Sequence, residues 1–164
     1  MNIATVLDVN FARTLNIFSR LTWLCNRFNT VIINGNNSYI NAAASDDDEF
    51  TWAEVDRDYT LVVYNLTIAH YNRAIKNNMG NCFLYNVHFD SNKIDYWFAK
   101  DYGAVIFNVG YLVLVNCTFS GNYAYNHEND VLNVGDGIVY YNGIKVTKGY
   151  YGPIAYTEDL ISLL

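Results

Sequence analysis

The chain has 164 residues, of which 52% are hydrophobic and 16% are charged; this favours one folded domain with a real core over a disordered segment. Its formal net charge of −6 and its pI near 4.8 argue against nucleic acids and anionic membranes as partners, because an acidic surface repels phosphate groups. The three cysteines form no CxxC pair and have no histidine at ligand spacing. We therefore expect no disulfide framework, no metal site and no cofactor.

The N-terminal part of the chain carries apolar residues at steps of three and four. The set is Leu7, Phe11, Leu15, Phe18, Leu21, Cys25 and Phe28. This period predicts an amphipathic helix over residues 1–29, which we expect to cap the open end of a repeat array. A helix that binds a membrane surface or a partner is the alternative interpretation. The segment lacks the basic and apolar regions of a signal peptide, and we expect no membrane span, signal peptide or anchor in this chain.

Residues 30–143 repeat. The stretches LVVYNLTI (61–68), CFLYNVHF (82–89) and LVLVNCTF (112–119) align with Asn65, Asn86 and Asn116 at the same place, at spacings of 21 and 30 residues. A second block, AIKNNMGN (74–81), aligns with AVIFNVGY (104–111), which places Asn78 over Asn108, and GIVYYNG (137–143) resembles a third copy. TVIINGNNSYI (30–40) is a more degenerate first copy of the first block.

Short strands that recur in the same order between Asn or Gly corners predict an all-β fold, a parallel β-helix, for residues 30–164 with a C-terminal tail. In such a coil each position of the repeat becomes a column. Stacked Asn65, Asn86 and Asn116 would then form a structural ladder, because Asn tolerates the left-handed corner conformation and its amide can bond to its copies. An antiparallel sandwich does not predict equivalent residues at a fixed minimum spacing. Whether the tail from residue 144 caps the coil is left open.

The segments NLTIAHYN, NVHFDSNK and NCTFSGNYA, which alternate with GAVIFNVG, resemble the right-handed β-helix repeats of adhesin-like surface proteins of methanogenic archaea. They are more loosely similar to the repeats of bacterial polymorphic outer-membrane proteins. This resemblance implies a right-handed parallel β-helix of about four to five rungs, secreted or displayed on the cell surface, with a non-catalytic role in attachment. Its implied partner is a glycan or a host or microbial cell surface.

The repeat is interrupted by three insertions, within residues 45–59, 94–103 and 125–136. If the rungs are in register, all three leave from one corner and lie on one face, and loops on a rigid scaffold are where binding concentrates. They combine carboxylates with aromatic rings, which suit a glycan. The candidate ligand-binding residues are Trp52, Asp95, Tyr96, Trp97, Asp101 and Tyr125. The alternative is a solvated acidic rim; calcium is disfavoured because no calcium-loop pattern is present.

We expect no enzyme, because no paired-acid motif recurs on the strands, where a rigid catalytic pair would be held. Polysaccharide lyases and glycoside hydrolases that use the same scaffold are the alternative class. The three histidines fall at unrelated positions of the repeat, which is typical of surface residues. A degenerate fragment of a longer adhesin, with no independent function, is the remaining interpretation.

Overall fold

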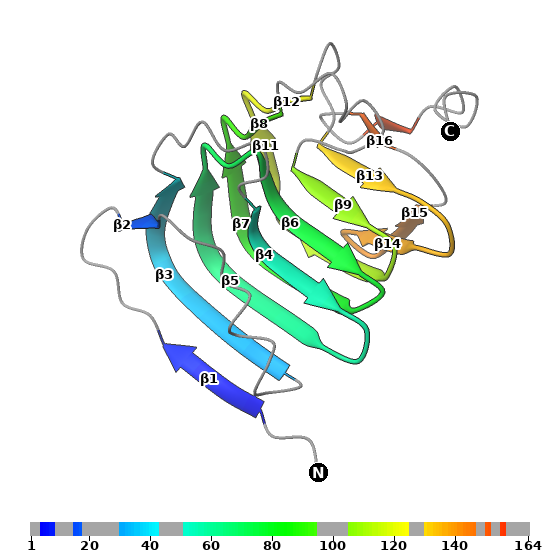
Figure 1. Cartoon of the computed structure of the whole chain (residues 1–164), viewed down its shortest axis with the longest axis horizontal. Helices are drawn as coiled ribbons and strands as arrows, with labels where there is room; N and C mark the ends of the chain where they lie inside the picture. The colour runs from blue at the N-terminus through cyan, green and yellow to red at the C-terminus, as the bar shows by residue number, and fades with distance from the viewer. Residues whose placement is uncertain are drawn as a thin grey trace.

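The computed structural model describes residues 4–8, 15–17, 30–42, 51–94, 105–124, 130–146, 150–151 and 155–156. Every regular element in these ranges is a β-strand (Figure 1). The main sheet contains β1 (Ala4–Asp8), β2 (Leu15–Ile17), β3 (Thr30–Ala42), β5 (Thr60–Ala69), β7 (Asn81–Asp90), β10 (Tyr111–Val115), β11 (Thr118–Ser120), β14 (Ile138–Tyr141) and β15 (Ile144–Val146). The second sheet contains β4 (Thr51–Asp56), β6 (Arg73–Asn78), β9 (Ile106–Asn108) and β13 (Val131–Asn133). β8 (Lys93–Ile94) pairs with β12 (Tyr123–Ala124), and β16 (Tyr150–Tyr151) with β17 (Ala155–Tyr156).

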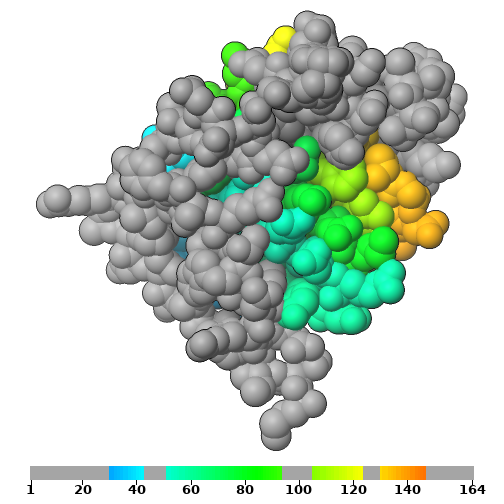
Figure 2. Space-filling model, viewed as in Figure 1, coloured from blue at the N-terminus to red at the C-terminus, as the bar shows by residue number. Residues whose placement is uncertain are grey.

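The chain passes repeatedly from the main sheet to the second sheet and back, and we call one such pass a rung. Each strand pairs in parallel with its equivalent one rung away, in the order β1-β3-β5-β7-β10-β14 in the main sheet and β4-β6-β9-β13 in the second. Successive rungs lie side by side as bands that run from cyan through green to orange in Figure 2. The predicted all-β class and parallel pairing are confirmed.

The predicted alignment of the first block is also confirmed. Leu61 pairs with Cys82, and Cys82 pairs with Leu112. Val31 pairs with Leu61, so residues 30–40 are a copy of the first block, as predicted. The hydrogen-bonded register therefore follows the residue spacing in the sequence.

The core lies between the two sheets and is filled by alternate side chains. In β5 the residues Leu61, Val63, Leu66 and Ile68 are at most 3% exposed, and the residues between them are half-buried. The second sheet contributes Val55, Ile75, Ile106 and Val131 to the same cluster. Burial of each such side chain contributes about 1.5–3 kcal/mol relative to an exposed one.

Asparagines form the corner that divides the main sheet into an upstream and a downstream half. Asn65, Asn86 and Asn116 have φ of 52°, 54° and 51°. Asn86 Nδ2 donates to Asn65 Oδ1 at 3.1 Å, and Asn65 Nδ2 donates to Asn34 Oδ1 at 3.3 Å. At Asn116 the backbone N–H donates to Asn142 Oδ1 at 2.9 Å. The predicted Asn column is thus present: side-chain bonds join Asn34, Asn65 and Asn86, and Asn116 is joined to the next rung through its backbone.

A second ladder is buried in the second sheet. Asn77 Nδ2 donates to Asn108 Oδ1, and Asn108 Nδ2 donates to Asn133 Oδ1, both at 2.7 Å. The three residues are at most 5% exposed. A buried amide is costly unless its polar atoms are bonded, so each Asn here requires its neighbours in the column.

A third ladder follows the downstream half of the main sheet. Asn92 Nδ2 donates to Asn122 Oδ1 at 3.0 Å, and Asn122 Nδ2 donates to Asp130 Oδ1 at 3.1 Å. The same amides also donate to backbone carbonyls, including that of Ile68 at 3.1 Å. Each corner of a rung is therefore held by a column of hydrogen-bonded side chains.

The helix predicted for residues 1–29 is wrong for the two stretches that the structure describes there. β1 pairs with β3 from Ala4 opposite Thr30, and β2 pairs with it from Leu15 opposite Ile40. These strands add a further rung to the main sheet. The edge of β3 presents a row of N–H and C=O groups, and pairing with that row outweighs a helical pattern of apolar residues.

The predicted pairing of Asn78 with Asn108 is wrong by one residue. Asn77 lies opposite Asn108, at a separation of 31 residues. Met79, with φ of 68°, is an extra residue in this turn and bridges to Asp56. Asn78 instead donates to Asp56 Oδ1 at the surface, at 3.0 Å.

Residues 137–143 belong to a different column from the one predicted. β14 pairs with β10, with Ile138 opposite Tyr111, rather than with β9. The chain then turns at Asn142 and Gly143, which have φ of 47° and 81°, and β15 returns antiparallel to β14. Asn-Gly is the preferred sequence for a two-residue hairpin. The hairpin ends the parallel order at this edge, and β16 lies beside β13.

Candidate functional site

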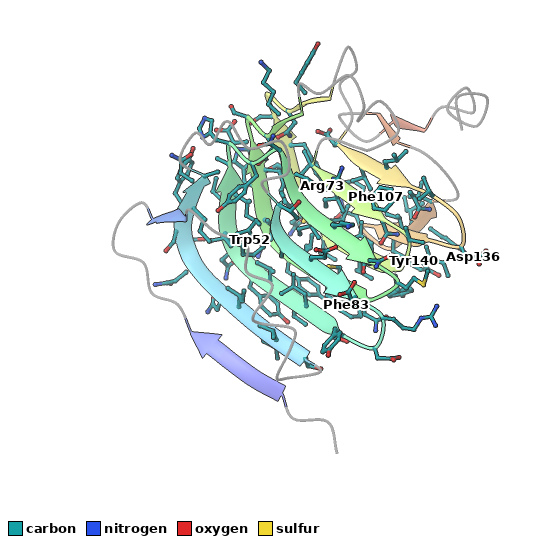
Figure 3. The ribbon with its side chains drawn as sticks, in the orientation of Figure 1. Trp52, Arg73, Phe83, Phe107, Asp136 and Tyr140 are labelled. Carbon is teal, nitrogen blue, oxygen red and sulfur yellow. The ribbon has the colours of Figure 1, made fainter. Side chains whose placement is uncertain are left out.

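One predicted site residue, Trp52, lies in the described part of the chain, and its side chain is 1% exposed within the core cluster (Figure 3). It belongs to β4, which occupies part of the range 45–59 predicted as a loop. The other five predicted residues, Asp95, Tyr96, Trp97, Asp101 and Tyr125, lie outside the described residues. A core position does not offer the Trp52 ring to a ligand, so the structure removes this residue from the predicted surface site.

The segments that hold the other five residues are flanked by equivalent positions of successive rungs. Ile94 pairs with Ala124 on one side, and Ile106 pairs with Val131 on the other. This agrees with the expectation that the two insertions leave the scaffold at the same corner.

The outward side of β3, β5, β7, β10 and β14 in the upstream half of the main sheet carries no charged side chain, and we call it the aromatic face. Its side chains alternate with the core residues and are all half-buried. They are Thr30, Ile32, Asn34, Thr60, Val62, Tyr64, Asn81, Phe83, Tyr85, Tyr111, Val113, Val115, Ile138 and Tyr140. A flat surface of this composition loses little on desolvation and is suited to contact with another apolar surface.

The aromatic rings on this face have two arrangements. Tyr64 and Tyr85 are stacked, with centroids 4.9 Å apart and planes at 12°, so each covers a face of the other. Phe83 and Tyr111 are tilted at 54°, and Tyr111 and Tyr140 at 49°, with centroids 5.9 Å and 5.8 Å apart. Rings tilted in this way leave part of their faces free for other contacts.

The outward side of the downstream half carries hydroxyl, imidazole and carboxylate groups, and we call it the polar strip. Its residues are Tyr39, Asn41, Thr67, His70, His88, Asp90, Ser91, Thr118 and Ser120. Pairing in register brings them together from different rungs, because His88 lies opposite both Thr67 and Thr118. His70 and His88 thus share one surface, which the sequence did not suggest.

Asp90 organises the strip. Its Oδ1 accepts hydrogen bonds from Ser120 Oγ at 2.9 Å and from Ser91 Oγ at 3.1 Å. Burial, followed by the charge of Asp90, raises the pKa of Tyr39, so the Tyr39 hydroxyl keeps its proton. On the other side His70 Nδ1 lies 2.6 Å from Asn41 Oδ1. The result is a dense array of donors and acceptors at the surface.

The strip contains Ser, His and Asp side chains but not the geometry of a catalytic triad. Ser120 Oγ lies 3.3 Å from His88 Nε2, yet the carboxylate of Asp90 bonds to the serine rather than to the imidazole. His88 Nδ1 is 2.6 Å from Thr118 Oγ1. In a triad the carboxylate orients the imidazole that takes the serine proton. The observed order instead favours a hydrogen-bonding surface.

The outer side of the second sheet differs in chemistry. Lys76 Nζ and Glu54 Oε1 form an ion pair at 2.7 Å. The guanidinium of Arg73 lies over the Phe107 ring, 5.6 Å from its centroid, and both residues are labelled in Figure 3. Charged groups thus occupy this side and are absent from the aromatic face.

In the ranges that the structure describes, no three His, Cys, Asp or Glu side chains gather into a metal site, and no helix is long and apolar enough to cross a membrane. The two described cysteines, Cys82 and Cys117, are buried free thiols. Comparison of the chain with protein-family models, with curated proteins and with solved structures finds no match.

Proposed function

We propose that this chain is a non-catalytic attachment module that binds glycans. The observation that supports it is the union of two surfaces on one sheet: the uncharged aromatic face and, across the Asn corner, the polar strip. Sugars present both apolar C–H faces and hydroxyl groups, so they suit aromatic rings beside hydrogen-bonding side chains. The three Asn ladders support this surface rigidly, which lowers the cost of ordering it on binding.

We place this surface on a right-handed parallel β-helix. The support is the recurring passage between two parallel sheets that share one core, and right-handed crossovers are nearly universal between parallel strands of one sheet. A crystal structure with left-handed crossovers would contradict this part of the proposal.

The resemblance to adhesin-like repeats extends the proposal to the location and the role. The module acts at a cell surface or outside the cell, where it attaches to glycans of another surface. Surface labelling of intact cells of the source organism with an antibody to the chain tests the location, and labelling only after lysis would oppose it.

A glycan array tests the binding function. Purified protein is probed against plant, fungal, microbial and host glycans, with heat-unfolded protein as the control. Binding by folded protein alone supports the proposal, and silence across the array contradicts it. Release of reducing sugar from any bound glycan would show instead that the chain is an enzyme.

The array also compares two locations for the site. The predicted insertion residues are tested by Trp97→Ala, and the polar strip by Asp90→Asn, which leaves the shape of the side chain intact. Loss of binding in Trp97→Ala alone places the ligand at the insertions, and loss in Asp90→Asn places it on the main sheet.

A further inference from the structure

Phe83, Tyr111 and Tyr140 lie on β7, β10 and β14, one rung apart from each other along the main sheet. Their rings are tilted by about 50° from one to the next, and all three side chains are half-buried. We infer that these three residues, which we call the tilted trio, form the stacking platform for a neutral glycan. This inference rests on the proposed function and identifies its ligand class and its contact residues.

The orientation of the rings separates the tilted trio from the stacked pair. A sugar ring stacks by laying its C–H face against the face of an aromatic ring. Tyr64 and Tyr85 have nearly parallel rings with centroids 4.9 Å apart, so each uses one ring face on the other. Tilted neighbours cannot cover each other in this way. The trio therefore offers ring faces to a ligand, whereas the stacked pair mainly stabilises the sheet.

The absence of charge points to a neutral ligand. None of the described outward side chains of the aromatic face is charged. Two charged residues flank the face in register: Lys145, opposite Tyr140 on β15 and exposed, and Asp8, opposite Asn34 on β1. A lysine on an edge strand is a common device against edge-to-edge aggregation. Its position there has a structural explanation, so it does not require an acidic ligand.

The size of the face favours a small flat ligand over a second copy of the chain. Five strands at about 4.8 Å spacing and five residues at about 3.3 Å give a face of roughly 20 Å by 15 Å, or about 300 Å². A stable protein interface needs about 800 Å² from each partner. The face is therefore less than half of what a stable dimer requires, and it is large enough for a short run of sugar rings.

Calorimetric titration of the full chain tests the inference. The probes are a soluble neutral β-glucan oligosaccharide mixture and, for comparison, polygalacturonate oligosaccharides of similar length. Tyr111→Leu keeps an apolar side chain but removes the ring. We expect it to weaken binding of the neutral probe about three- to tenfold. Tyr111→Phe keeps the ring and should bind as the unmodified chain does.

The matched control is Tyr85→Leu, the same substitution in the stacked pair, which should change affinity less than about twofold. Because the loss of a ring also perturbs the sheet, the thermal midpoint of each variant is measured. If Tyr111→Leu does not fold, Tyr140→Leu repeats the test beside the edge strand. An equal loss of affinity in Tyr85→Leu and Tyr111→Leu would overturn the assignment of the platform.

The other outcomes are also decisive. Binding that is lost in Trp97→Ala but unchanged in Tyr111→Leu overturns the inference and leaves the proposed function standing. Binding of polygalacturonate alone, abolished by Lys145→Ala, overturns the choice of a neutral ligand. If the unmodified chain binds neither probe and no glycan on the array, the proposed function itself fails.

Discussion

Asn77→Ala and Asn78→Ala are the same substitution at adjacent positions, and they separate the buried ladder from the surface. Asn77 is fully buried and donates through Nδ2 to Asn108 Oδ1 at 2.7 Å and to the Tyr111 carbonyl at 3.2 Å. Asn78 is half-buried and makes one bond, to Asp56 at 3.0 Å. The register of the second sheet therefore makes only the first substitution severe.

The structure sets the size of the difference. Asn77→Ala removes two hydrogen bonds, worth about 1 kcal/mol each, and leaves two buried acceptors without these donors. Removing Asn77 Oδ1 offsets part of this loss of stability, because this buried acceptor has no hydrogen-bond partner among the described residues. We expect a loss of about 2 kcal/mol, which lowers the thermal midpoint by about 4–8 °C for a chain of this size. Asn78→Ala should cost about 0.5 kcal/mol or less.

Thermal and urea unfolding followed by circular dichroism measure both variants. Asn108→Ala, in the middle of the ladder, should be the most destabilising of the three, because Asn108 both donates and accepts there. An equal loss for Asn77→Ala and Asn78→Ala, or a larger one for Asn78→Ala, would refute the register.

Three further predictions concern single positions. Gly110→Ala should prevent folding or lower the free energy of unfolding in urea by several kcal/mol, because a Cβ there would lie 2.2 Å from the Gly80 carbonyl oxygen. An unchanged urea midpoint would contradict the close stacking of the two glycines. Burial raises the pKa of Cys117 from 9.0 to about 11, so the thiol of the unfolded chain loses its proton at a lower pH than the folded one. The free energy of unfolding should therefore fall by about 1.4 kcal/mol per pH unit across that range. Cys117→Ala should lack this fall, and an identical pH profile for the variant and the unmodified chain would refute the role of Cys117. Asn142 should deamidate faster at alkaline pH than Asn34, although both are followed by glycine. Asn142 lies in an exposed turn, whereas Asn34 is held in β3 by two hydrogen bonds to its side-chain oxygen. Peptide mass spectrometry measures the two rates, which should converge in urea-unfolded protein.

The sequence predicted the main-sheet columns well because residues at the corners are constrained. Asn65, Asn86 and Asn116 are held at positive φ, and few other residues adopt that conformation without strain. The spacing of these asparagines therefore reports the length of each rung. Asn108 was also expected to recur in a column, and it is a buried member of a ladder.

Prediction failed where two adjacent residues of the same type were equally suitable locally. Asn77 and Asn78 are adjacent, and only the extra residue Met79 decides which of them points inward. The acidic stretch before Thr51 suggested a loop that extended too far, although Ala53 and Val55 are buried on either side of half-buried Glu54, as strand residues are. The Asn-Gly pair at residue 142 was a usable hairpin signal that the repeat pattern concealed.

The N-terminal error has a different cause. Steps of three and four between apolar residues predict the helix that the segment would form in isolation. The unpaired edge of β3, with which β1 and β2 pair instead, exists only in the folded chain. The candidate site was missed because the prediction followed the insertions, whereas its two surfaces arise from the outward positions of columns that join residues 21 or 30 positions apart. Phe83 and Tyr111 become neighbours only because Asn81 pairs with Tyr111.

The two buried ladders pass their hydrogen bonds in one direction, toward the C-terminal rungs, and this direction gives each column a beginning and an end. An amide both accepts and donates, so an asparagine continues a column, whereas a carboxylate only accepts. Asp130 accepts from Asn122 and so stops its column. Asn133 donates out of its column to the Gly137 carbonyl at 2.8 Å. At the other end Asn77 lies opposite Val55 of β4, whose apolar side chain cannot continue the ladder, so the column begins at Asn77 and its hydrogen bonds have a fixed polarity.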